Sequence, residues 1–511
     1  MKHRCAFPAP QFVALLGLAV LMPALAAAAS ASPQIDAPKV SPGFEAARSK
    51  GGAPSPPAGR NAGEMIMKTP LPLPAGARIT LKQAVAIAVK YHPRAKEAAA
   101  QSGAADERVG EARAFLGPQL YGIAEYLRST DNGIGNTSYY NPGGLLPRMT
   151  GRNHDLASGD FSQSWDTADN YVAGVAVTQH LFDFGRRRGF VAERRFQAAA
   201  TKEEEKLVSL DLIFGVSLRY FHLLQAKQLV RVYEKAVEER RFHLHEAKVK
   251  ADAGLRPELD VYVTQAEVQR AELHLVDARN SEENARVAFD NALGLGGREP
   301  NYQLADVLTY GSITDRLAAL LQEALQLRPD MKALADQARA MGAKIVQARS
   351  DYWPTATAVA GYSTMGTGTP PANNVNVGVV LVWPIFNSYL TSHQVSEAKL
   401  SQKAVESHIE DLRQRIILQV KTAFLDWQAS LKRIHRAKET LEASRVQLEL
   451  AEKRYSAGLA DIVELEDAQR SYTNDDAAYA NALYGFSLAK AAVDRATARS
   501  LAALEPEPAK K

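Results

Sequence analysis

The sequence predicts a mainly α-helical fold with a β-barrel contribution, in which one order of helices and strands occurs twice. Two observations lead to this fold class: a column of apolar residues at heptad spacing that ends at a glycine turn, and a copy of both placed 204 residues earlier (458 − 254 = 204). A third is the pair of alternating, strand-length segments that precedes each heptad helix. Together they predict duplicated long α-helical hairpins and four strands per chain.

The second hairpin turns at Gly458 and Leu459. Gly458 is free to take the left-handed conformation that ends a helix, and a helical pattern resumes from Asp461. Before the turn, one heptad column is large and apolar and the interleaved column is small, as in a tightly packed coiled coil. The large column holds Tyr455, Leu448, Leu441, Ile434, Trp427 and Val420, and the small one holds Ala451, Ser444, Ala437, Ser430 and Ala423.

The first hairpin turns at Gly254 and Leu255, the residues that lie 204 positions before Gly458 and Leu459. The same subtraction applied to the large column gives an apolar column again. It holds Ala251, Leu244, Val237, Val230, Leu223 and Val216. The duplication therefore preserves the apolar seam of the hairpin.

The N-terminus has the pattern of a secretory signal peptide. Lys2 and Arg4 precede an apolar run, and small residues follow it. A membrane anchor is the alternative, but Pro23 and the alanines interrupt the run too early for a transmembrane helix. Cys5 is the only cysteine of the chain and lies inside this segment, so the mature chain has no disulfide, no thiol nucleophile and no cysteine zinc site.

Composition and repeat boundaries give the organisation of the rest of the 511 residues. The formal net charge is only +4 and its sign is mixed along the helices, so a nucleic-acid partner is not expected. The expected segments are a signal peptide at 1–31, a Pro/Gly-rich disordered extension at 32–78, a first structural repeat at 79–300, a second at 301–500 and a disordered C-terminal tail at 501–511.

Each repeat contains two alternating segments of about ten residues around a polar loop. The loop of the first repeat, 129–170, is longer than that of the second by 32 residues, which is the difference between the repeat offsets before and after it (236 − 204 = 32). The four predicted strands are 119–128, 171–182, 355–364 and 375–386. No segment after the signal peptide is expected to span a membrane as a helix, but these strands are long enough to cross one when tilted.

Four strands cannot close a barrel, and open strand edges are not tolerated in lipid. The strands are therefore expected to close with those of other subunits. Three copies would give twelve strands, an even number in the usual range for outer-membrane barrels. Physics requires an oligomer but does not by itself fix the number three.

Four groups of residues carry a family resemblance. They are Ile79-Thr80-Leu81 with Ala84 and Ala88 before His92-Pro93, Leu181-Phe182-Asp183-Phe184-Gly185 at a strand-to-helix junction, Gly254-Leu255 with Asp260-Val261, and Arg454-Tyr455 with Gly458. With these motifs the chain resembles the TolC family of outer membrane efflux proteins over about residues 79–497. The resemblance implies a homotrimer with a twelve-stranded outer-membrane β-barrel, continued by a periplasmic α-barrel of helices. It also implies two partners, a periplasmic adaptor (membrane fusion) protein and an inner-membrane transporter of the RND or ABC type.

The resemblance assigns Glu464 and Asp467 to the constriction of the tunnel. They stand three residues apart on one helix face just past the second turn. Three copies would place six carboxylates round a narrow entrance and favour cations. The alternative is that both are solvated charges of a coiled coil.

Tyr455 and Asp260 hold the positions of a family latch, a hydrogen bond that links the two hairpins and helps to keep the entrance shut. Alternatively, Tyr455 only continues its heptad column. A second family latch uses a basic residue two places after the turn glycine, but Ala460 holds that position here and its partner position is Leu259. That second latch is therefore expected to be absent.

No catalytic residue, metal site or cofactor is expected. His243 and His245 are two apart on a helix and point away from each other, so they do not form a metal pair. The resemblance therefore implies an outer-membrane export channel for small molecules or proteins, in efflux or type I secretion. The alternatives are a periplasmic adaptor, which has only one helical hairpin, and a structural coiled-coil protein, which would leave the strands without a role.

Overall fold

The structure is a computed structural model that describes residues 76–130, 167–295, 301–366 and 372–502. Its contacts divide the chain into Met1–Pro70, which lies wholly outside the described residues, and Leu71–Lys511, to which the description below refers. The predicted signal peptide, most of the predicted extension and residues 503–511 of the predicted tail also lie outside the described residues.

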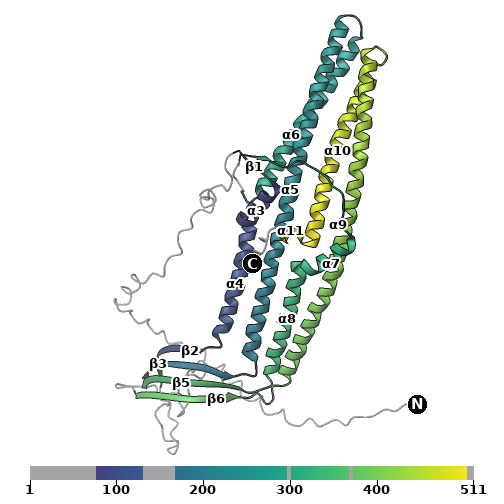
Figure 1. The fold of residues 1–511 in the computed structure, drawn as a ribbon. Coiled ribbons are helices and arrows are strands. Elements are labelled where there is room, and N and C mark those ends of the chain that lie inside the picture. Colours follow the sequence, from purple (N-terminus) through teal and green to yellow (C-terminus); the bar gives the residue numbers. More distant parts are fainter. Residues whose placement is uncertain (1–75, 131–166, 296–300, 367–371, 503–511) are drawn as a thin grey trace, which may run out of the picture. The chain divides into compact units, whose positions relative to one another are not determined.

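The described chain is mostly helical and has one order of elements twice (Figure 1). The first set is β1 (Ala77–Ile79), α3 (Leu81–Tyr91), α4 (Pro93–Ala114), β2 (Gln119–Thr130), β3 (Thr167–Phe182), α5 (Arg186–Asp252) and α6 (Glu258–Ala292). The second set is β4 (Tyr302–Leu304), α7 (Leu317–Leu327), α8 (Pro329–Ser350), β5 (Thr355–Gly366), β6 (Ala372–Val382), α9 (Leu390–Ser456) and α10 (Ile462–Thr497), followed by α11 (Arg499–Ala502).

The lengths of matching elements confirm the duplication. Helices α3 and α7 each have 11 residues, α4 and α8 each have 22, and α5 and α9 each have 67. The start of α8 follows that of α4 by 236 residues (329 − 93), whereas α9 follows α5 by 204 (390 − 186). The offset changes between the strands of each pair, where the sequence predicts the insertion.

The predicted helix signals act as expected. Thr80 and Gln83 form a capping box at the start of α3, and Pro93 is the first residue of α4. Gly254 and Gly458 have φ angles of 68° and 76°, in the left-handed region that ends α5 and α9.

Several boundaries differ from the sequence prediction. The last strand ends at Val382 rather than at residue 386, because Pro384 cannot donate a ladder hydrogen bond. The predicted extension contains Ala77 and Arg78, but these belong to β1, which pairs in parallel with β4. Three-residue strands are too short to carry a periodic pattern, and their pairing joins distant parts of the chain. Similarly, α11 continues to Ala502 inside the predicted tail.

The four long strands form one antiparallel sheet in the order β2-β3-β5-β6, so β2 and β6 are its edges. One face is apolar and exposed, and the other face is buried at Val172, Ala176, Thr178 and Ser363. Two cross-strand rows run over all four strands on the apolar face: Leu120, Val177, Ala360 and Val377, and then Gly122, Val175, Tyr362 and Val375.

The heptad seam lies in the helix interfaces as predicted. Helices α9 and α10 pack together, and α5 packs against α6, α8, α4 and α10. The large column of α9 is buried at Val420, Trp427, Ile434, Leu448 and Tyr455. By length and composition alone α5 is apolar enough to cross a membrane over one window of mean hydropathy 1.5, contrary to the sequence prediction. Packing of α5 against its neighbouring helices buries 39% of this window.

Candidate functional site

The two hairpin tips share one backbone geometry. Leu255 donates its N–H to the carbonyl of Lys250 at 2.9 Å, and Leu459 donates to the carbonyl of Arg454 at 2.8 Å. This six-to-one hydrogen bond around a left-handed glycine is the Schellman motif. It leaves Leu255 and Leu459, both predicted tip residues, each 74% exposed. Each tip thus presents a bare leucine to solvent.

Arg256 joins the first tip to the second. Its Nη2 donates to the backbone carbonyls of Tyr455 at 3.1 Å and Ala460 at 3.0 Å. Its guanidinium also lies over the Tyr455 ring, 4.7 Å from the centroid, in cation–π geometry. One arginine therefore holds both the last turn of α9 and the loop that follows it.

Sequence reasoning missed Arg256, although a signal for it existed. The basic residue expected two places after the turn glycine is absent at Ala460 but present at the repeat-equivalent position (460 − 204 = 256). In this chain the first hairpin carries the arginine, and its acceptors are backbone carbonyls of the second hairpin. Leu259, the predicted partner position, is 66% exposed and belongs to the first tip.

The predicted hydrogen bond between Tyr455 and Asp260 is absent from the structure. Both side chains are buried, but Tyr455 Oη and Asp260 Oδ2 each lack a hydrogen-bond partner. They are nevertheless near each other. Burial raises the pKa of the Tyr455 hydroxyl, and the charge of the nearby Asp260 adds to that shift. The ring is held by Arg256 and by Lys250, whose Nζ lies 4.7 Å from its centroid. Contact with two cations, rather than a hydroxyl–carboxylate bond, fixes the ring.

Asp260 is buried at the start of α6. Burial raises the pKa of its carboxyl group, while Arg256 opposes that shift and Asp461 adds to it. Tyr455 and Asp260, which the sequence singled out, thus lie in one buried region. Arg256 of the first hairpin contacts Tyr455 of the second there.

Glu464 and Asp467 both lie exposed on α10, as predicted. Each has an arginine partner within the chain that the sequence analysis did not assign. Glu464 pairs with Arg454 of α9 at 2.9 Å, and Asp467 pairs with Arg470 at 2.9 Å. Two carboxylates per chain are therefore accompanied by two guanidinium groups.

Large exposed aromatic and aliphatic side chains gather at the junctions between strands and helices. Phe184 stacks on Trp353 with ring centroids 5.1 Å apart, and Trp383 donates its indole N–H to the carbonyl of Tyr352 at 3.2 Å. Asp183 caps the start of α5 by accepting from the backbone N–H groups of Gly185 and Arg187. Aromatic residues at this position are typical of the interface girdle of an outer-membrane protein.

His243 is buried and faces carboxylates on two helices. Its Nδ1 lies 3.5 Å from Glu246, and its Nε2 lies 3.8 Å from Glu452 of α9. Within the ranges that the structure describes, no three His, Cys, Asp or Glu side chains are grouped so that they could hold a metal ion. The cluster is an electrostatic contact between the two hairpins.

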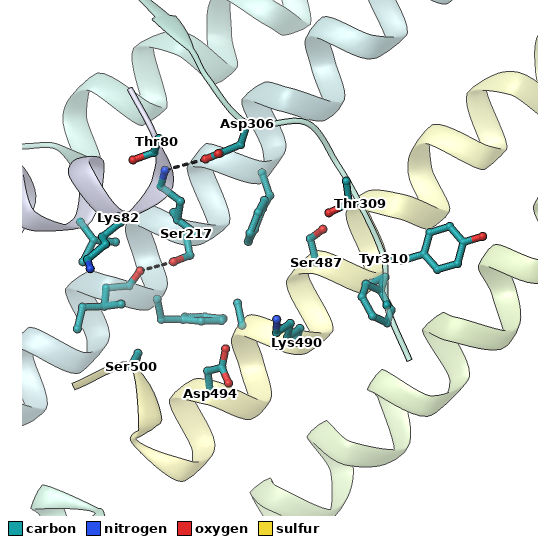
Figure 2. Close-up of a pocket in the computed structure, with 18 of the residues that line it drawn as sticks. Thr80, Lys82, Ser217, Asp306, Thr309, Tyr310, Ser487, Lys490, Asp494 and Ser500 are labelled. Carbon is teal, nitrogen blue, oxygen red and sulfur yellow. Dashed lines mark hydrogen bonds between the residues drawn. The ribbon is translucent and has the colours of Figure 1, made fainter. Parts of the chain in front are cut away.

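Figure 2 shows a cavity of about 790 Å³ lined by α3, α5, α10 and the segment after β4. Asp306 at its edge accepts from the N–H of Leu81 at 2.9 Å and from the Tyr220 hydroxyl at 2.6 Å. It is therefore a structural carboxylate that fixes the start of α3. Asp494 of the opposite wall has a pKa raised by burial, which Lys490 opposes.

Comparison with known proteins places this arrangement in a family. The family described as outer membrane efflux protein matches residues 87–295 and 320–499. The chain belongs to this family. As an outer membrane efflux protein it resides in the outer membrane with a large periplasmic portion, and its role is that of an efflux channel. Members of the family are channels rather than enzymes.

Relatives agree with this assignment along most of the chain. The outer membrane protein TolC of Escherichia coli is 24% identical over 422 residues, which cover 77% of this chain and 77% of TolC. The cation efflux system protein CusC of the same species is 23% identical over 64% of this chain and 72% of its own length. A pyoverdine export protein, OpmQ of Pseudomonas aeruginosa, is 25% identical over 64% of the chain and 70% of its own length.

Solved structures share the fold. A membrane protein from Pseudomonas aeruginosa superposes with a TM-score of 0.67 at 20% identity and covers 82% of this chain and 93% of its own. A structure of CusC gives a TM-score of 0.67 at 17% identity over 84% and 97% of the two chains. At identities of 17% and 20%, these superpositions show that the fold is shared and nothing further.

Proposed function

We propose that three copies of this outer membrane efflux protein form one continuous export duct. Twelve strands, four from each copy, close a β-barrel in the outer membrane, and the long helices of the three chains form a periplasmic α-barrel. The duct exports small molecules or proteins together with a periplasmic adaptor and an inner-membrane transporter of the RND or ABC type. The predicted signal peptide at 1–31 supplies the route out of the cytoplasm.

The observation that carries the proposal is the sheet with two free edges and one exposed apolar face. Val375, Val377, Val379 and Leu381 alternate along β6 and are 64–80% exposed. In water such a face on an unpaired edge strand would promote aggregation. In a bilayer the face suits lipid, and pairing of β6 with β2 of the next copy removes both edges.

The hairpin tips supply the contact with the rest of the export machinery. Leu255 and Leu459 are exposed at equivalent positions, so three copies would present six bare leucines at one end of the α-barrel. We infer that these leucines are the docking points for the adaptor. Tyr455, Asp260 and Arg256 then keep each pair of hairpins together, while Glu464 and Asp467 line the constriction.

Val379→Arg is expected to reduce the yield of trimers in the outer membrane. It places a charge on the apolar face of β6 in mid-strand, which costs about 2–4 kcal/mol per copy in a bilayer. Gly378→Arg is the matched control, because residue 378 points to the opposite face and a side chain there meets open space. Native gels of detergent-extracted outer membranes measure the yield; equal yields for both variants would contradict the proposed facing of the strand.

Cysteines at Asn153 and Ala457 are expected to label oppositely in intact cells. Asn153 belongs to the predicted long loop, which lies outside the described residues, and Ala457 is at the second tip. Outer-membrane barrels place long loops outside the cell and short connections in the periplasm. An impermeant maleimide should therefore reach Asn153→Cys alone, and reaction at Ala457→Cys in intact cells would invert the proposed topology.

A further inference from the structure

A buried cluster of charges joins the two hairpins behind the tips. Arg240 of α5 donates from Nη1 to Glu267 of α6 at 2.8 Å and to Glu466 of α10 at 2.8 Å. The three side chains are only 7%, 5% and 3% exposed. One guanidinium thus connects both arms of the first hairpin to the second, and we name this set the Arg240 cluster.

The two carboxylates of the Arg240 cluster are not equally satisfied. Oε1 of Glu267 receives Arg270, and also Arg470 at 3.3 Å. Oε1 of Glu466 is buried and has no hydrogen-bond partner. Gln469, one turn further along α10, also has both amide atoms buried without partners. Glu466 is therefore the carboxylate that is held least well in its charged form.

The surroundings of Glu466 favour its protonated form. Burial raises the pKa of Glu466 to about 7, with the charge of Glu267 adding to the shift and Arg240 opposing it. The charged or titratable groups that act on it come from all helices packed around it. They are Arg240 from α5, Glu267 and Arg270 from α6, Tyr455 from α9 and Arg470 from α10.

The coiled-coil seam does not require this cluster. Arg240 occupies the repeat-equivalent position of Ser444 (444 − 240 = 204), a small buried residue of the second hairpin. A buried ion pair contributes little stability compared with apolar packing, and its best-attested use is to specify or switch a contact. The first hairpin thus has a large charged residue, Arg240, where the second hairpin has a small one, Ser444.

The position of the cluster connects it to the tips. Arg240 precedes Gly254 by 14 residues (254 − 240) and Glu466 follows Gly458 by 8 (466 − 458), so the cluster lies about 12–21 Å along the helices from the turns. Separation of the tips moves α10 relative to α5 and exposes the cluster to water. A group whose proton affinity depends on burial would then respond to that movement.

We propose that the Arg240 cluster is a proton-sensitive clamp, which favours joined hairpins at mildly acidic pH and releases them as the pH rises. This inference rests on the proposed function only in taking tip separation as opening of the channel. The geometry itself concerns contacts within one chain.

The direction follows from linkage. With the hairpins joined, Glu466 titrates near 7, whereas after separation it is solvated and returns towards its usual value of 4.5. Between these two values the joined state binds more protons, so a rise in pH through this window favours separation. The difference between 4.5 and about 7 corresponds to a change of about 10²–10³ in the ratio of the two states per chain across the whole window.

The test measures the distance between the tips at two pH values. Spin labels at Leu255→Cys and Leu459→Cys occupy the exposed tip leucines. No background mutation is needed, because Cys5, the single native cysteine, lies in the predicted signal peptide. Labelled chains are diluted with unlabelled chains, and double electron–electron resonance is recorded in detergent at about pH 5.5 and about pH 8. We expect the short-distance population to fall about tenfold or more relative to the long one at the higher pH.

Three variants show whether Glu466 causes the pH response. Glu466→Gln keeps the shape of the side chain and removes its titration, so its tips should stay joined at both pH values. Glu272→Gln, a half-buried carboxylate of α6 paired with Arg241, is the matched control and should respond like the parent. His243→Gln removes the other contact between the hairpins that contains a titratable side chain, and the pH response should persist in this variant even if the distances at each pH shift. The proposal is overturned if the parent distances are the same at both pH values, or if the response persists in Glu466→Gln.

The measurement separates this inference from the proposed function. Tip distances within one chain can be read whether or not the protein conducts. Absence of trimers or of conductance with a pH-dependent tip distance would overturn the duct and retain the clamp. A conducting trimer with fixed tips would do the reverse.

Discussion

Arg256→Ala is expected to raise the conductance of the channel in planar bilayers more than any change at Tyr455 alone. The guanidinium holds two carbonyls of the second tip and the ring of Tyr455, and no other side chain makes these hydrogen bonds among the described residues. A hydrogen bond to a charged group contributes about 1.5–3 kcal/mol. Three copies opening together would lose about 5–9 kcal/mol, enough to move a closed channel largely to the open state.

Two comparisons sharpen this prediction. Tyr455→Phe removes a hydroxyl that has no hydrogen-bond partner, so on its own it should leave the conductance near that of the parent. Combining it with Asp260→Ala tests the family latch, and we expect a smaller effect than that of Arg256→Ala. Arg445→Ala removes an exposed pair with Glu442 and serves as the control. Parent-like conductance of Arg256→Ala would show that other contacts hold the tips.

Glu464→Gln with Asp467→Asn is expected to change ion selectivity without opening the channel. In the proposed trimer the change removes six negative charges but leaves the partners Arg454 and Arg470 in place. The constriction then keeps its guanidinium groups without these carboxylates, so the cation preference should weaken. Block by multivalent cations should weaken for the same reason.

The opposite change provides the matched test. Arg454→Gln leaves Glu464 without its partner and should strengthen the cation preference. Reversal potentials in a salt gradient measure both effects, and they should be larger at low ionic strength because exposed charges are screened by salt. If neither variant alters the reversal potential, the two acids are solvated coiled-coil charges and do not line the pore.

Local signals determined most of the fold. The heptad columns before Gly254 and Gly458, the capping box at Thr80 and the alternation along β6 each depend on residues close together in the sequence. The matching lengths of the elements confirm the duplication. Strands β1 and β4 were missed because three residues carry no period and their pairing joins Ala77 to Tyr302.

The functional site depended far more on tertiary structure. Sequence reasoning found Tyr455, Asp260, Glu464 and Asp467 through family positions, and it found the tip residues through the glycine turns. It assigned a hydrogen bond that the structure lacks, because the direction of a hydroxyl and the place of a competing guanidinium depend on packing. It also left Glu464 and Asp467 unpaired, although Arg454 belonged to a motif that it had already singled out.

The sequence by itself determined the duplication, the hairpins and the four strands, since each follows from periodicity or from local turn chemistry. The class of channel followed from the resemblance to a family. Tertiary structure alone decided which charges meet. Arg240 and Arg256 come from the first hairpin, and their partners Glu466 and Tyr455 come from the second, roughly two hundred residues later. Such contacts depend on how two long helices align side by side, and a pattern within either helix carries no record of that alignment.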